Sequence, residues 1–85
     1  MPRNLTHPLS PGELAALRLA ASGYTSRQIA RRLGTTESGI HLRLKSATAK
    51  LGARSRTHAA VTAVANGLIH LDELELPDQQ REVAA

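Results

Sequence analysis

A row of polar side chains recurs at helical spacing near the middle of this 85-residue chain. Its members are Ser38, His41, Lys45 and Thr48. Residues three or four apart share one face of an α-helix, so these side chains should point together toward solvent or a partner. Hydroxyl, imidazole and ammonium groups in such a row can hydrogen-bond base edges in the DNA major groove, which is wide enough to admit one helix. The plainer interpretation, a solvated helix face, fits the row equally well.

The residue types that carry catalysis or metal binding are not grouped in this sequence. The chain has no Cys, which removes thiol chemistry, disulfides and zinc-finger ligation. Its four His residues do not follow metal-ligand spacing, and no paired carboxylates accompany them. The sequence shows no arrangement of a nucleophile, a base and an orienting group. We therefore expect no enzymatic activity, no metal and no cofactor.

Charge is divided unevenly along the chain. Residues 1–69 hold ten basic and two acidic residues, whereas residues 70–85 hold one arginine and five acidic residues. A basic body favours an acidic polymer as partner, nucleic acid before membrane, although charge alone fits a merely basic surface as well. No run approaches the roughly 18 apolar residues of a membrane span, and no signal-peptide run follows the start. We expect a cytoplasmic protein with no membrane partner, associated with the nucleoid when bound to DNA.

Start and stop signals divide the body of the chain into four short helices. Each signal pair is a residue that can cap a helix start and, after an apolar periodic run, a glycine. The caps are Ser10, Thr25, Thr36 and Ser55, and the glycines are Gly23, Gly34, Gly52 and Gly67. Helices are therefore predicted near 11–22, 26–33, 37–51 and 56–66. Because the chain has one aromatic residue, its core must consist of Leu, Ile, Val and Ala, which suits an all-α fold.

The second and third predicted helices form a helix-turn-helix candidate. Only Gly34 and Thr35 separate the end of one from the cap of the next. In such a motif the second helix enters the major groove and the first crosses the phosphate backbone. Ser26, Arg27 and Arg31 offer donors on the first helix. The pair alone is weak evidence, since many all-α domains contain two helices joined by a short turn.

Motifs found in order along the chain resemble the LuxR-type, or GerE-like, DNA-binding domain. They are Leu9–Leu17, Gly23–Leu33, Thr36–Ile40, Lys50–Gly52, Arg54–Thr57 and the closing Gly67–Ile69. The resemblance covers residues 9–69 without a gap. It implies a four-helix bundle that binds double-stranded DNA sequence-specifically as a homodimeric transcriptional regulator, with residues 37–51 in the major groove.

The resemblance also implies roles for individual residues. The base-reading positions fall on His41, Leu42 and Lys45. The phosphate-holding positions fall on Ser26, Arg27, Thr36, Ser38, Arg43 and Lys50. The fourth helix would form the dimer contact through His58, Ala60, Val61, Val64 and Ala65. Two alternatives stay open for Leu42, which either packs on a thymine methyl group or fills the space beside the second helix. Arg54 and Arg56 hold either phosphate or the acidic tail.

Four positions depart from the family pattern. Gly39 stands where a Thr is usual, and a glycine inside a helix costs about 1 kcal/mol relative to alanine. His41 replaces a common Lys or Arg, and Ala15 replaces a frequent second Glu. His58 occupies the usual Glu position of the fourth cap, so we expect no capping box there. These departures leave the fold intact and the preferred DNA sequence open.

A second class of function fits the same fold. The chain could be a protein-interaction module that heterodimerises with another regulator, or caps it, through the fourth helix, with weak DNA binding of its own. Salt separates the two classes, because binding through several phosphates weakens steeply as salt rises.

The domain organisation has three expected parts: a flexible lead at 1–8, the DNA-binding domain at 9–69 and an acidic tail at 70–85. The tail is either solvated and mobile, or its apolar residues extend the core or dimer face while its acidic residues shield basic surface. Those apolar residues are Leu68, Ile69, Leu71, Leu74 and Leu76. Because only eight residues precede the domain and the first is Met, a standalone regulator is favoured over an excised domain.

Overall fold

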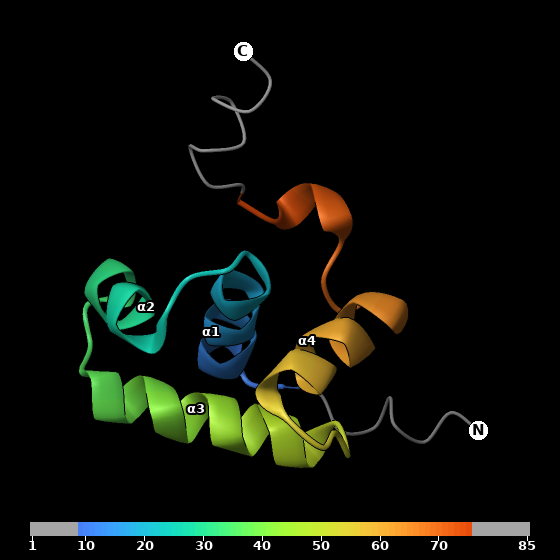
Figure 1. Ribbon diagram of the computed structural model, residues 1–85, viewed down its shortest axis with the longest axis horizontal. Helices are drawn as coiled ribbons and strands as arrows, with labels where there is room; N and C mark the ends of the chain where they lie inside the picture. The colour runs from blue at the N-terminus through green and yellow to red at the C-terminus, as the bar shows by residue number, and fades with distance from the viewer. Residues whose placement is uncertain (1–8, 76–85) are drawn as a thin grey trace.

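The computed structural model describes residues 9–75, which form four α-helices and one short 3₁₀ turn with no strand among them. The elements are α1 (Pro11–Ala21), α2 (Ser26–Leu33), α3 (Glu37–Lys50), α4 (Arg56–Ala65) and η2 (Leu71–Glu73) (Figure 1). The all-α fold with four helices is confirmed, and each observed helix end lies within one residue of the predicted one. The expectations for residues 1–8 and for Leu76 lie outside the described residues.

The helix starts are fixed by the side chains that the sequence indicated. In the capping box of α1, the Glu13 N–H donates to Ser10 Oγ at 3.1 Å, and the Ser10 N–H donates to Glu13 Oε1 at 2.9 Å. Thr25 and Gln28 form the same reciprocal pair at α2. Gly34 ends α2 with φ 69°, a left-handed conformation that a side chain would strain. This glycine therefore permits the tight turn into α3.

The α4 start uses His58 in an unexpected way. The His58 N–H donates to Ser55 Oγ at 3.1 Å, so Ser55 caps the helix as predicted. His58 Nδ1 accepts a hydrogen bond from the Arg54 N–H at 3.0 Å, one residue before the cap. The imidazole thus satisfies a backbone donor at the loop–helix junction, although the family's Glu is absent.

The core is small and aliphatic, and α1 lies at its centre. Figure 1 shows α1 between α2 and α4 with α3 along one side, and α1 packs against all three. The largest fully buried side chains are Leu17, Ile29, Ile40 and Ile69. Fully buried alanines let the helices approach closely; they are Ala16, Ala47, Ala59 and Ala63. This packing fixes α3 against the bundle by one face and leaves its opposite face free.

Residues 70–75 fold back onto the corner between α1 and α2, on the side of α1 away from α3 (Figure 1). The Glu75 N–H donates to Ser22 Oγ at 2.8 Å. Glu75 Oε1 accepts hydrogen bonds from Tyr24 Oη at 3.1 Å and from Arg32 Nη2 at 2.7 Å. Leu74 packs against the core, whereas Leu71 is 71% exposed. The sequence assigned no structure to this segment, and the structure gives it an anchoring role.

Candidate nucleic-acid interface

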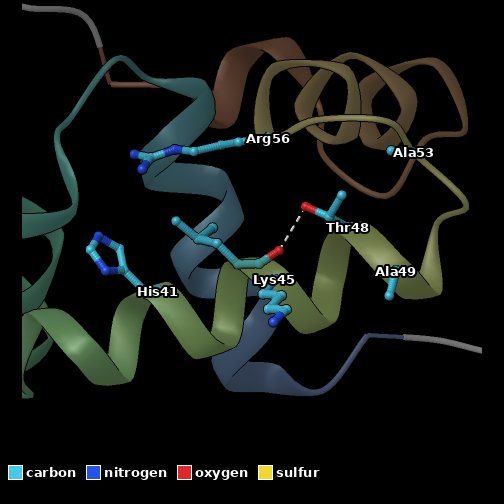
Figure 2. Close-up of a pocket in the computed structure, with 7 residues that line it drawn as sticks. His41, Lys45, Thr48, Ala49, Ala53 and Arg56 are labelled. Atoms are coloured by element: carbon cyan, nitrogen blue, oxygen red, sulfur yellow. Dashed lines mark hydrogen bonds between the residues drawn. The ribbon is translucent and has the colours of Figure 1, made fainter.

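The outer face of α3 carries the polar row that the sequence singled out. Ile40, Leu44 and Ala47 point into the core, so with 3.6 residues per turn Ser38, His41 and Lys45 point outward, and all three are exposed. Thr48 is half-buried and donates its hydroxyl hydrogen to the Leu44 carbonyl oxygen at 2.7 Å (Figure 2). The face that would meet a partner is therefore made of Ser38, His41 and Lys45 together with Leu42.

The exposure of Leu42 excludes one of the two roles considered for it. Its side chain is 68% exposed, so it does not fill the space beside α2. A single exposed leucine is common on protein surfaces, and here it lies where a partner of α3 could contact it. Among base edges, the thymine methyl group offers the matching apolar surface.

One flank of α3 is tied to the start of α1. Ser46 Oγ donates to Glu13 Oε2 at 2.6 Å, and Lys50 Nζ donates to Glu13 Oε1 at 2.9 Å. The Arg43 guanidinium lies over Gly12, where a Cβ would stand 3.5 Å from Arg43 Cζ. Lys50, a predicted phosphate ligand, therefore already has a carboxylate partner, and Arg43 lies at the edge of the free face.

The Glu13 carboxylate is the electrostatic centre of that flank. Burial alone would raise its pKa, but hydrogen bonds from Ser46, the Ser10 backbone and Lys50, together with the Lys50 charge, outweigh burial and lower the pKa from 4.5 to about 2. Glu13 stays ionised at neutral pH, so both of its oxygens hold their partners on α3. The orientation of α3 relative to α1 is thereby fixed.

The predicted phosphate ligands on α2 and the turn differ in exposure. Arg27, Thr36 and Ser38 are exposed and available to a partner. Ser26 is only 6% exposed, and its Oγ accepts a hydrogen bond from Arg56 Nη1 at 2.7 Å. Arg32, at the far end of α2, pairs with Glu75 and lies 5.0 Å from the centre of the Tyr24 ring. Arg27 is thus exposed to a partner, whereas Arg32 is held by the C-terminal segment.

An open groove of about 510 Å³ runs along the other flank of α3, between α3 and the start of α4 (Figure 2). His41 and the Arg56 guanidinium lie at one end, and Ala49 and Ala53 lie at the other (Figure 2). The complete lining is His41, Leu44, Lys45, Thr48, Ala49, Ala53 and Arg56. No acidic side chain is among these residues, so the groove is electropositive.

Arg56 is one of the two arginines whose role the sequence left undecided. Its Nη2 donates to the Tyr24 carbonyl oxygen at 2.9 Å, in addition to the bond from Nη1 to Ser26. Within residues 9–75 it forms no ion pair with the acidic segment, which pairs instead with Arg18 and Arg32. The partners of Arg56 lie 30 and 32 residues earlier in the chain, so no local pattern could have indicated them.

The predicted dimer residues line the outer side of α4. His58, Val61 and Ala65 are exposed, Val61 by 59%, and Ala60 and Val64 are half-buried. An apolar depression of about 250 Å³ lies there, bounded by Ala21, Ala60, Val61, Val64, Leu71 and Leu74. The C-terminal segment therefore forms one wall of the surface that the sequence assigned to α4 alone.

With this geometry established, comparison with known proteins identifies the family. The model of "Bacterial regulatory proteins, luxR family" matches residues 7–63. This chain belongs to the luxR family. As a member of that family it has the helix-turn-helix that the sequence predicted, formed by α2 and α3.

The curated relatives of this luxR-family chain are described as regulators. The chain is 40% identical over 70 residues to "Transcriptional regulatory protein YdfI" of Bacillus subtilis. These residues make up 82% of this chain and 32% of that protein. It is 36% identical over 67 residues to "HTH-type quorum sensing-dependent transcriptional regulator VjbR" of Brucella ovis, covering 79% of this chain and 26% of that protein. The chain thus spans about a third or less of the length of these relatives. No solved structure matches it.

Within residues 9–75, no helix is both long and apolar enough to cross a membrane. In the same part of the chain, no three His, Asp or Glu side chains gather as a metal site would require.

Proposed function

We propose that this chain binds double-stranded DNA sequence-specifically and regulates transcription, acting at the bacterial chromosome. The observation that carries the proposal is the free outer face of α3, on which Ser38, His41, Leu42 and Lys45 stand exposed while the opposite face is locked into the core. A helix presented in this way can enter the major groove without rearrangement of the bundle.

The proposed contacts divide into base reading and phosphate anchoring. His41, Leu42 and Lys45 read base edges, Lys45 favouring the O6 and N7 acceptors of guanine and Leu42 a thymine methyl group. Arg27, Thr36, Ser38 and Arg43 hold phosphates beside the groove. Ser26 and Lys50 support the same surface, Ser26 through Arg56 and Lys50 through Glu13.

We propose further that two copies bind DNA together through α4. The exposed Val61 and the apolar depression beside it support this part of the proposal, because apolar surface in water favours a covering partner. The same depression supports a second candidate function, in which a different regulator occupies this surface and DNA binding is weak.

Selection from a randomised duplex library tests the proposal. Purified protein is mixed with the library, bound fragments are separated by mobility shift and sequenced, and Lys45→Ala is run beside wild type. An enriched motif that Lys45→Ala weakens by roughly tenfold, the scale of one good base contact, is the expected result. Arg32→Ala is the matched control, since it removes one positive charge from a side chain paired with Glu75. Weak binding without an enriched motif would favour the partner-protein function.

A further inference from the structure

The groove between α3 and α4 combines three cationic or hydrogen-bonding groups with no compensating acid. Arg56, His41 and Lys45 line it, and none of its other described lining residues carries charge. The acidic group nearest His41 is Glu37 on the same helix, whose Oε2 is 3.9 Å from Nε2 and which does not line the groove. The groove therefore has the electrostatics of an anion site.

Arg56 is held in place by neutral acceptors. Its two Nη atoms donate to Ser26 Oγ and the Tyr24 carbonyl oxygen, which fix the plane of the guanidinium without neutralising it. The ordinary partner of such a half-buried guanidinium is a carboxylate or phosphate, which matches its planar fork of donors. Within the described chain no carboxylate pairs with Arg56, so its charge remains available to a ligand.

The position of the groove indicates which anion reaches it. A helix in the major groove lies between two sugar-phosphate strands, and α3 has a cation beside each of its flanks, Arg43 of its own and Arg56 at the start of α4. Arg43 lies on the flank toward α1, over Gly12, and Arg56 lies on the flank toward α4. When the outer face of α3 meets base edges, the α3–α4 groove therefore faces one of the two backbones.

We propose that this groove binds a backbone phosphate of the DNA, with the Arg56 guanidinium and the His41 imidazole as donors and Lys45 adding charge beside them. The proposal rests on the proposed DNA-binding function. Ser26 is then a positioning residue, because its hydroxyl reaches the phosphate only through Arg56. In this site His41 contacts the backbone in place of the base contact proposed above, while Leu42 and Lys45 remain turned toward the bases.

A charge placed in the groove tests the site without touching Arg56 or the outermost line of α3. Thr48 lines the groove, and glutamate and glutamine both suit a helix interior. Thr48→Glu and Thr48→Gln have the same length and differ only in charge, so each controls the other. Affinity for a labelled duplex is measured by fluorescence anisotropy at several salt concentrations. We expect Thr48→Glu to bind about tenfold or more weakly than Thr48→Gln and to lower the salt slope by about one unit, the loss of one phosphate contact.

Arg56→Gln supplies an independent reading, with circular dichroism and thermal melting to establish that the variant is folded. In a folded Arg56→Gln variant, the salt slope of DNA binding should also fall by about one unit relative to wild type. The loss of affinity should be the same on every duplex sequence. If Thr48→Glu and Thr48→Gln bind alike while wild type binds DNA with steep salt dependence, the groove site is wrong and the proposed function survives. If wild type shows no salt-dependent binding to DNA, both the groove site and the proposed DNA-binding function are wrong.

Inorganic phosphate separates a backbone phosphate from a free phosphate ion. A site for DNA predicts no change in melting temperature when millimolar phosphate replaces chloride at constant ionic strength. Thermal stabilisation of wild type that Thr48→Glu abolishes would instead show a free-phosphate site, and would overturn the assignment to DNA.

Discussion

Lys50 and Glu13 join the end of α3 to the start of α1 through an ion pair of 2.9 Å. Both side chains are largely shielded from water, and Ser46 and the Ser10 N–H complete the set of donors around the carboxylate. Since α1 is the centre of the bundle, this pair determines how α3 is presented to a partner. Lys50, which the family resemblance assigned to phosphate, thus orients α3 relative to α1.

This arrangement predicts a stability loss in acid. Because the pKa of Glu13 is lowered from 4.5 to about 2 on folding, its contribution is complete above pH 4.5 and disappears as the pH falls toward 2. The shift corresponds to about 3 kcal/mol at most. Glu13→Gln should lower the free energy of unfolding at pH 7 and flatten its decline between pH 5 and 2, as measured by urea denaturation at each pH. Equal pH slopes in the two proteins would contradict the assignment.

Alanine substitutions at Ile40 and Leu42 on α3 should have opposite effects: the first should lower stability, and the second should weaken DNA binding. Ile40 is fully buried, so Ile40→Ala should lower the free energy of unfolding by about 2–5 kcal/mol. Leu42 is exposed, so Leu42→Ala should change stability by less than about 0.5 kcal/mol yet weaken binding to the selected DNA site. Thermal melting and anisotropy on the same samples check both. Replacing thymine by uracil in that site removes only methyl groups, and wild type should lose affinity where Leu42→Ala does not.

The helices could be predicted closely because their signals are local. Ser10, Thr25, Thr36 and Ser55 each cap the backbone within three residues, and a glycine ends each run in a left-handed conformation. Such signals are complete within a few residues of sequence. The helix bounds could therefore be predicted without knowledge of how the helices pack.

The groove and the C-terminal anchor could not be predicted because their partners are distant in sequence. Arg56 meets Ser26 across 30 residues, and Glu75 meets Tyr24 across 51. Before folding, Glu75 is one of several acids in a charged stretch, and nothing in its neighbourhood selects it. Lys50 shows the same limit: the family resemblance implied a phosphate-holding role for it, while its carboxylate partner Glu13 lies on another helix.

The position of residues 70–75 predicts that they stabilise the domain without shielding the DNA face. A chain ending after Glu75 keeps the Leu74 packing and the Glu75 hydrogen bonds, whereas one ending after Ile69 loses both. We expect the shorter chain to be less stable by roughly 1–3 kcal/mol. Its DNA affinity below the melting transition should not exceed that of the longer chain, because residues 70–75 lie away from α3 and form one wall of the proposed dimer surface. Tighter DNA binding by the chain ending after Ile69 would instead support electrostatic shielding.

Replacing Gly39 by alanine should change stability by an amount that depends on Thr35. Alanine inside a helix is favoured over glycine by about 1 kcal/mol. A Cβ at residue 39 would stand 3.0 Å from Thr35 Oγ1 and 3.2 Å from Thr36 Oγ1, and Thr36 is held because it caps α3. Gly39→Ala alone should therefore gain less than about 0.5 kcal/mol, and should gain more, up to about 1 kcal/mol, in a Thr35→Ala background, where the shorter of the two contacts is removed. Additive effects in a double-mutant cycle of urea denaturation would show that the contact does not matter.

Val61 predicts how far the α4 surface serves self-association. It is exposed beside the apolar depression, and covering a valine side chain is worth about 1.5 kcal/mol or more, roughly tenfold in a dissociation constant. Val61→Glu should therefore raise the dimer dissociation constant by about tenfold or more, measured by sedimentation equilibrium. Thr57→Glu is the matched control, because residue 57 is exposed on the same helix and does not line the depression. If wild type sediments as a monomer at every concentration and binds DNA as one, the α4 surface is free for a different protein, which the second candidate function requires.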